Sequence, residues 1–165
     1  MSETLHLWAV APAAIGTCCL AADRARVRPP EVVASVLMLL AMLDAGLFGV
    51  VPPVYWAAVL LAAAVGLAFW RRPRQRHAPR VPPLMTAHTA TGMALMAGLQ
   101  MAMSAHGGGA SPHAHGLGLP AFLLATALGY AAASAWAMHH MPARLDRAQI
   151  GAMAASVALM AVAAV

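Results

Sequence analysis

Long apolar runs alternate with short polar segments along the entire chain. Six runs contain roughly the 20 mostly apolar residues that a helix needs to cross the ~30 Å hydrocarbon layer of a bilayer. Alanine is abundant in all six runs, which favours close packing between helices. The pattern predicts an all-α integral membrane protein, a single domain made of a six-transmembrane helix bundle with short loops. The predicted spans cover residues 5–22, 32–51, 53–70, 83–105, 117–138 and 148–165.

Every basic residue lies in the segment after the first, third or fifth predicted span. All ten are arginines, and the segments after the second and fourth spans contain none. Cytoplasmic loops of membrane proteins are enriched in basic residues. This alternation therefore predicts that the protein lies in the bacterial cytoplasmic (inner) membrane and that both of its termini are on the outer side. The arginines are Arg24, Arg26, Arg28, Arg71, Arg72, Arg74, Arg76, Arg80, Arg144 and Arg147.

The composition excludes several other classes of protein. Hydrophobic residues make up 62% of the chain and charged residues 9%, whereas soluble domains have about 25% charged residues. A soluble globular enzyme and a disordered chain are therefore excluded. The net charge of +5 does not indicate a nucleic-acid partner, because the arginines flank apolar runs as topology signals do. No Gly-x-Ser-x-Gly motif is present, so we do not expect a hydrolase.

Methionine and histidine are the residues that offer candidate chemistry, and the chain has twelve and eight of them. Thioether sulfur is a soft ligand that suits Cu(I), while imidazole suits Cu, Zn, Fe and Ni. In the span 83–105, five positions fall within about 80° of one another on a helix of 100° per residue. This stripe consists of Met85, His88, Gly92, Met96 and Met103.

Two other spans also place methionines on one helix face. Met38 and Met42 are four residues apart, and Met153 and Met160 are seven apart, so each pair shares a face. If these faces converge with the stripe, several thioethers and His88 meet inside the bundle and form a site for a soft metal. Plain packing is the alternative for each methionine, because Met is also an adaptable core filler.

His88 is the best single candidate for a metal ligand, because an ionisable residue within a span is a functional candidate by default. We expect Thr91 or a backbone carbonyl to bond one ring nitrogen. The other nitrogen would then face the methionines, with Met38 or Met42, and Met153, close to the ring. The alternative is a histidine that is hydrogen-bonded to these groups and binds no metal.

Asp44 is the only acid within a predicted span. It lies about 10 Å from the outer end of its helix, and Gln100 lies at a similar depth, about 8 Å, at 1.5 Å per residue. We therefore expect Asp44 to hydrogen-bond Gln100, or His6 near the start of the first span. Structural pairing between helices and a role as proton relay or cation ligand both remain open.

The outer loop after the fourth span is rich in histidine and glycine. It contains His106, His113 and His115, and a short His-rich tract is a composition typical of metal capture. A solvated polar loop is the alternative. If the loop captures metal, we expect weak binding of Zn or Cu(II) that the bundle does not need for folding.

The pattern of His and Met positions resembles a family of small actinobacterial membrane proteins known as domain of unknown function 5134. The similar features are a span with His and spaced Met, a His/Gly outer loop, a span that ends in polar or charged residues, and a last Gly/Met span. The residues concerned are His88, Met96, Met103, His106 to His115, Tyr130 to His140, Gly151 to Met160, and Met38 to Met42. The resemblance implies a metal-associated membrane protein and carries no established activity.

Three functions follow from these observations as hypotheses. The first is a membrane protein that binds or handles copper or another soft metal. The second is a non-catalytic accessory subunit of a larger membrane complex, such as a respiratory or copper enzyme, and this function needs no cofactor. The third is a b-type haem electron carrier, which needs two axial ligands at one depth. His88 with His139 or His140 is the only pair that would suit.

Overall fold

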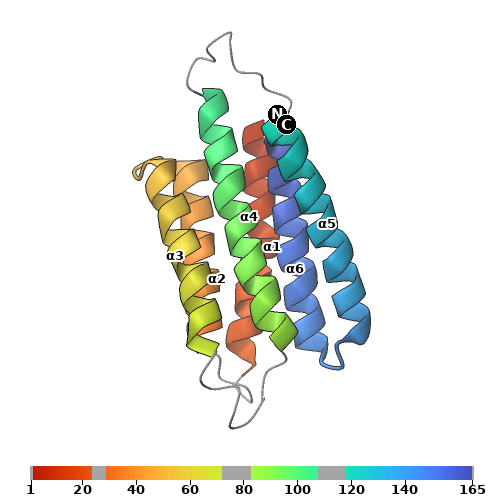
Figure 1. Cartoon of the computed structure of the whole chain (residues 1–165). Helices are drawn as coiled ribbons and strands as arrows, with labels where there is room; N and C mark the ends of the chain where they lie inside the picture. Colours follow the sequence, from red (N-terminus) through yellow and green to blue (C-terminus); the bar gives the residue numbers. More distant parts are fainter. Residues whose placement is uncertain (1, 24–28, 72–82, 108–117, 165) are drawn as a thin grey trace.

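The chain folds into a bundle of helices (Figure 1). The structure is a computed structural model that describes residues 2–23, 29–71, 83–107 and 118–164. Within these ranges every regular element is a helix and there is no strand, which confirms the all-helical prediction. The elements are α1 (Ser2–Ala22), α2 (Pro29–Leu43), a π-helical turn η2 (Asp44–Phe48), α3 (Pro53–Arg71), α4 (Pro83–Gly107), α5 (Gly118–His140) and α6 (Arg144–Ala163).

The helix boundaries lie close to those that hydropathy predicts. When η2 is counted with α2, the largest difference is at the start of α6, which begins at Arg144 rather than at residue 148. Asp146 and Gln149 in the first turns of α6 are buried, so one face of this polar segment packs against the protein as part of the helix. Hydropathy detects only the apolar part of a helix. A helix whose first residues are polar therefore begins earlier in the sequence than hydropathy predicts.

Successive helices run in opposite directions, side by side (Figure 1). α1 packs mainly on α6, α3 mainly on α4, and α5 on α6 and α4. Because the helices alternate in direction, α1 starts at the same end of the bundle at which α6 finishes (Figure 1). The opposite end holds the last turns of α1, α3 and α5 and the first turns of α2, α4 and α6 (Figure 1). In the sequence, the arginines lie at or between these helix ends. We call this end of the bundle the arginine end.

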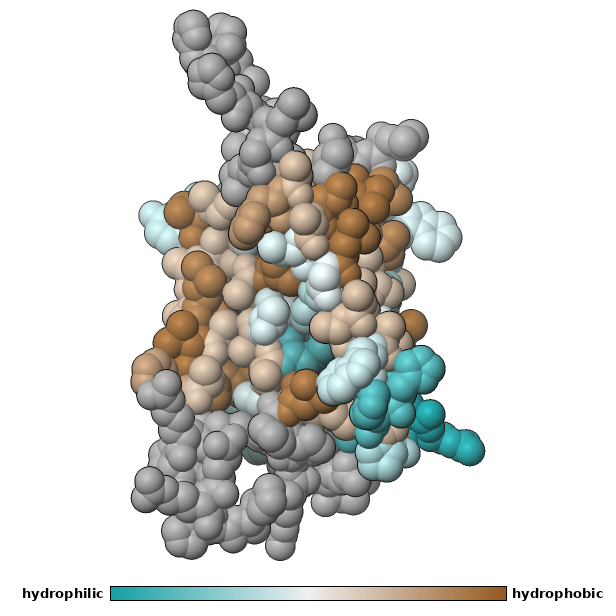
Figure 2. All heavy atoms as spheres, turned by 45° about the vertical axis from the view of Figure 1, so that its right-hand side comes forward, coloured by the Kyte–Doolittle hydropathy of each residue, from teal (hydrophilic) through white to brown (hydrophobic). Residues whose placement is uncertain are grey.

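Three helical segments are long and apolar enough to cross a membrane: Pro29–Phe48, Ala121–His140 and Arg144–Ala163. Leu7–Ala22 and Pro53–Phe69 are apolar helices of shorter length. Many large apolar side chains, among them Trp8, Phe48 and Phe122, are exposed on the outside of the bundle. Apolar atoms cover the middle of the face in Figure 2, and hydrophilic atoms gather mainly near the arginine end. A surface of this kind suits a hydrocarbon environment, and it identifies a membrane-associated helical protein.

The core between the helices is built from small residues and methionine. Alanines such as Ala9, Ala13 and Ala41 are almost completely buried where helices meet. Small residues let helix backbones approach closely, which matters in a bilayer because apolar burial alone gives no driving force there. Methionine fills the irregular spaces that remain, because its unbranched side chain adapts to them.

Candidate metal site and buried polar residues

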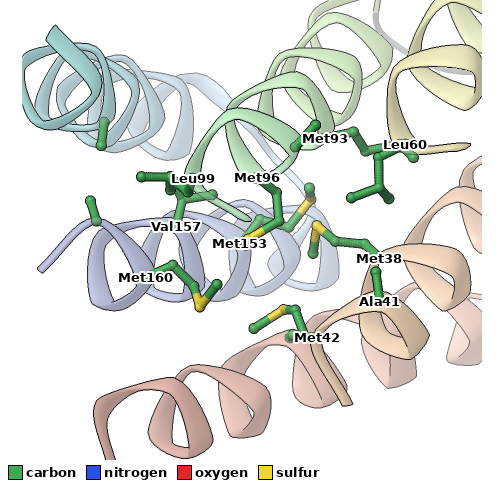
Figure 3. Close-up of a cluster of buried hydrophobic side chains, with 14 of the residues drawn as sticks. Met38, Ala41, Met42, Leu60, Met93, Met96, Leu99, Met153, Val157 and Met160 are labelled. Atoms are coloured by element: carbon green, nitrogen blue, oxygen red, sulfur yellow. The ribbon is translucent and has the colours of Figure 1, made fainter. Parts of the chain in front are cut away.

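Six buried methionines come together in the middle of the bundle, and we call them the thioether core. They come in pairs from α2, α4 and α6, and each is at most 2% exposed. In Figure 3 the side chains of Met38, Met96 and Met153 extend into one space between these three helices. The methionine faces of α2, α4 and α6 therefore contribute to one buried cluster, and their use as a metal site stays a prediction. The six residues are Met38, Met42, Met93, Met96, Met153 and Met160.

One sulfur of the thioether core also has a polar neighbour. The Ser156 hydroxyl on α6 lies 2.9 Å from the carbonyl oxygen of Ala9 and 3.6 Å from the sulfur of Met42. This hydroxyl therefore links α6 to α1 and to α2 at a position that is fully buried. The contact fixes the sulfur of Met42 near the junction of three helices.

The methionines of α4 divide differently from the predicted stripe. Met85 is buried, but in a separate small cluster near the arginine end, with Ala137, Met141 and Ile150. Met103 is only partly buried at the edge of the main core. Met93 was missed, although it is fully buried. The buried face of α4 is therefore wider than the predicted stripe. Met93 lies three residues before Met96, and this i, i+3 spacing could have indicated that the two residues share a face.

His88 lies in a buried loop of hydrogen bonds between α4 and α5. Its Nε2 is 2.8 Å from the Ser134 hydroxyl, and its Nδ1 is 3.1 Å from the Tyr130 hydroxyl. The Ser134 hydroxyl donates to the carbonyl of Tyr130 at 2.6 Å, one turn away on the same helix. The rings of His88 and Tyr130 are stacked, with centroids 4.6 Å apart.

One protonation state satisfies every member of this loop. Because Ser134 donates to a carbonyl, its oxygen is left to accept from Nε2–H of a neutral His88. Nδ1 then carries the lone pair and accepts from the Tyr130 hydroxyl. The expected partners, Thr91 or a backbone carbonyl, are wrong: Thr91 is exposed, and both ring nitrogens bond α5 side chains. Coordination of a metal by His88 would require one of these bonds to break.

Gly92 provides the space in which the Tyr130 hydroxyl lies. A Cβ atom at this position would be 2.6 Å from that hydroxyl oxygen and 3.0 Å from the terminal methyl carbon of Met153. The two contacts bring Tyr130 of α5 and Met153 of α6 over the same turn of α4. Gly92 is therefore the point at which the hydrogen-bonded loop and the thioether core adjoin.

Asp44 has partners other than those expected. Its carboxylate accepts from the backbone N–H groups of Val50 and Val51, at 3.2 and 3.0 Å, and from Nε1–H of Trp56 at 2.7 Å. The chain can reach the carboxylate because the π-helical turn ends at Gly49, which has φ of 60° and reverses the backbone. Asp44 thus holds the α2–α3 link in place, and the predicted bond to Gln100 is wrong. The side chain of His6 lies outside the described part of the structure, so the alternative bond to His6 stays a prediction.

Gln100 is buried on α4, with a side chain only 3% exposed. Among the described residues, neither its amide nitrogen nor its amide oxygen has a hydrogen-bond partner. The matched depth of Asp44 and Gln100 therefore did not indicate contact. Equal depth does not determine how two helices are rotated about their axes. In this protein the Asp44 carboxylate is hydrogen-bonded instead to Val50, Val51 and Trp56.

Of the remaining histidine candidates, only His139 and His140 have described side chains. His113 and His115 of the outer loop lie outside the described residues, and of His106 only the backbone, in the last turn of α4, is described. His139 and His140 are exposed at the end of α5, and His140 Nδ1 is 2.8 Å from the carbonyl oxygen of Trp136. In the described ranges, no three His, Cys, Asp or Glu side chains are grouped so that they could hold a metal ion.

The fold and the thioether core define a helical membrane-associated protein with a sulfur-lined interior. No family model, curated protein or solved structure is similar to this chain. The resemblance drawn from the pattern of His and Met positions therefore stays a prediction.

Proposed function

We propose that the protein is a six-span protein of the bacterial cytoplasmic membrane, with both termini outside, and that it binds Cu(I) in its thioether core. The observation that carries the proposal is the convergence of six buried methionines from α2, α4 and α6 (Figure 3). The donor set fits the ion, because thioether sulfur is a soft ligand that selects Cu(I) over harder divalent metals.

The charge of the ion supports the same choice. A charge inside a bilayer is expensive, and the thioether core supplies neutral ligands only. A monovalent soft ion therefore costs less in this core than a divalent one. The six-span topology is supported by the arginines, which in the sequence follow α1, α3 and α5 and are absent after α2 and α4, as expected for cytoplasmic loops.

Replacement of methionine by leucine tests the proposal, because this exchange nearly conserves volume and removes the sulfur. The test variant carries Met38→Leu, Met96→Leu and Met153→Leu. The matched control carries Met85→Leu and Met141→Leu, which change two buried methionines of the separate cluster. Detergent-purified protein is titrated anaerobically with Cu(I) against a chromogenic chelator. We expect the wild type and the control to bind Cu(I) with equal affinity, and the triple variant to bind at least about tenfold more weakly.

Two further variants distinguish Cu(I) binding by the thioether core from binding by His88 and by the histidines of the predicted outer loop. His88→Gln should leave Cu(I) affinity unchanged, because His88 uses both ring nitrogens in hydrogen bonds. Joint replacement of His106, His113 and His115 by Ala should remove weak binding of Zn or Cu(II) and leave Cu(I) binding intact. Equal Cu(I) affinity in the wild type and the triple methionine variant would overturn the copper proposal.

The same preparation discriminates the other two functions. Metal analysis that finds no copper, with other membrane subunits co-purifying, would favour an accessory subunit of a larger complex. A Soret band in the absorption spectrum would favour a haem carrier. The hydrogen bonds at His88 speak against haem, because an axial bond would displace Tyr130 or Ser134.

A further inference from the structure

Gln100 on α4 is a buried polar side chain whose amide forms no hydrogen bond. The side chain is 3% exposed, and within the described part of the chain neither its Oε1 nor its Nε2 has a partner. By contrast, the buried hydroxyls of Thr89 and Ser134 both donate to backbone carbonyl groups of their own helices. Burial of an unpaired amide costs free energy. Gln100 therefore weakens the fold unless a bound species engages the amide.

Gln100 belongs to the face of α4 that contributes to the thioether core. It follows Met96 by four residues and Met93 by seven, and positions with these spacings share one helix face. Both methionines are fully buried. Because the Cα–Cβ bonds of a helix tilt toward its N-terminus and α4 begins at the arginine end (Figure 1), the side chain of Gln100 leaves the backbone in the direction of Met96.

Met160 on α6 lies at the same height in the bundle as Gln100. α4 and α6 pack against each other, and both begin at the arginine end, so they run in the same direction (Figure 1). A Cβ atom at Gly92 would lie 3.0 Å from the terminal methyl carbon of Met153, which aligns these two positions. Gln100 is eight residues beyond Gly92, and Met160 is seven beyond Met153, which is about two helical turns in each case.

The surroundings of the amide do not suit a water molecule. A buried water needs two to four polar partners. The neighbours of Gln100 one turn before and one turn after it on this face are Met96 and Met103, and a thioether sulfur is only a weak acceptor. The amide therefore adjoins sulfur donors and few polar groups.

A soft monovalent cation can use both kinds of donor at this position. Thioether sulfurs hold the ion, and the amide oxygen directs the negative end of a dipole at its charge. Glutamine oxygen serves as a weak axial ligand in copper sites, and carbonyl dipoles replace the hydration shell of monovalent ions inside membranes. We propose that Oε1 of Gln100 is a weak additional ligand of the Cu(I) ion, beside the sulfurs of Met96 and Met160. This inference rests on the proposed function.

Three variants test the role of the amide. Gln100→Leu removes the polar atoms and keeps a side chain of similar size. Gln100→Met replaces the amide with a thioether on an unbranched side chain, which supplies another soft donor. Thr89→Val is the control on the same face of α4, because it removes a buried hydroxyl that is already bonded to the carbonyl of Met85.

Two measurements on the full chain in detergent follow the ion. Anaerobic titration against a chromogenic chelator gives the Cu(I) affinity. We expect Gln100→Leu to bind about tenfold more weakly than the wild type, as on loss of a supporting group at a metal site. Gln100→Met should regain the wild-type affinity, and Thr89→Val should retain it. X-ray absorption at the copper edge should detect one oxygen neighbour besides sulfur in the wild type, and sulfur only in both Gln100 variants.

Thermal unfolding of the metal-free protein distinguishes a ligand from a structural residue. If the amide is kept for the ion, Gln100→Leu should be at least as stable as the wild type, because it removes an unpaired buried amide. Lower stability of Gln100→Leu, its Cu(I) affinity equal to that of the wild type, or a sulfur-only spectrum of the wild type would each overturn the inference and leave the copper proposal intact. Failure of the wild type to bind Cu(I) would overturn both.

Discussion

Asp44 illustrates what an acid at the end of an apolar helix requires. Its carboxylate receives three N–H groups, two from the backbone of the following link and one from Trp56. Hydrogen bonds to a charged group are stronger than those between neutral groups. The residue therefore stabilises the turn between α2 and α3, and a role in proton or cation transfer is not needed to explain it.

Asp44→Asn should lower the free energy of unfolding, because a single amide oxygen replaces a carboxylate that accepts three donors. Trp56→Phe removes one donor and should cost less. Unfolding in detergent, followed by circular dichroism, measures both changes. Gln100→Leu is the control: it removes an amide that has no described partner and should be neutral or stabilising. A loss in Gln100→Leu as large as in Asp44→Asn would restore the predicted pairing of the two residues.

Sequence reasoning located the important residues better than it located their partners. His88, Asp44 and Gln100 are all buried, as we expect of polar residues in spans of a membrane protein, because lipid offers them no hydrogen bonds. The partners depend on how each helix is rotated about its axis relative to its neighbours, and periodicity within one helix does not contain that rotation. Tyr130 and Ser134, four residues apart on α5, were the available signal for His88, because polar residues spaced i, i+4 share one face.

At the scale of the element, the approach of α4 to α5 depends on one glycine. The Tyr130 hydroxyl lies where a side chain of residue 92 would be, and the same hydroxyl bonds His88. Close packing and interhelical hydrogen bonds are the terms that hold helices together in lipid. α5 meets both requirements at this position.

Gly92→Ala should destabilise the protein by about 1–3 kcal/mol, the usual cost of an overpacked core. The new Cβ would displace a rigid tyrosine and break its bond to His88. Gly66→Ala is the control, because its Cβ meets nothing within 4 Å. Thermal unfolding in detergent provides the comparison. Addition of Tyr130→Phe to Gly92→Ala should recover part of the loss, and equal stability of the two alanine variants would contradict the role of Gly92.

The helices themselves were predictable, and the reason is physical. A stretch of about 20 apolar residues has few alternatives to a helix in a membrane, because every backbone group must be satisfied within the segment. The methionine faces of α2 and α6 were also predictable, since both faces are strictly periodic. The methionine face of α4 was predictable only in part. α4 has neighbours on several sides, so its buried face is wide enough to include Met93 as well.

At the scale of the whole molecule, the alternating directions of the helices predict from which side of the membrane each connecting segment is accessible. In a variant with Cys18 and Cys19 replaced by Ser, a cysteine at Gln75 should react with a membrane-impermeant thiol reagent only after the cells are opened. A cysteine at Ser111 should react in intact spheroplasts. The positive-inside rule is the reason, since residues 71–80 contain five arginines and the outer loop has none. Labelling of the cysteine at Gln75 from outside would contradict the proposed orientation.

The thioether core also gives the interior a chemical liability that a leucine core would lack. Each sulfur can take up one oxygen atom and become a sulfoxide, which is polar and chiral. Few hydrogen-bond donors lie nearby to satisfy such an oxygen, the hydroxyl of Ser156 beside Met42 being one of them. Oxidation of a single methionine at the centre would therefore disturb three helices at once. The durability of the protein depends on reductants and on the exclusion of peroxide from its interior as much as on its packing.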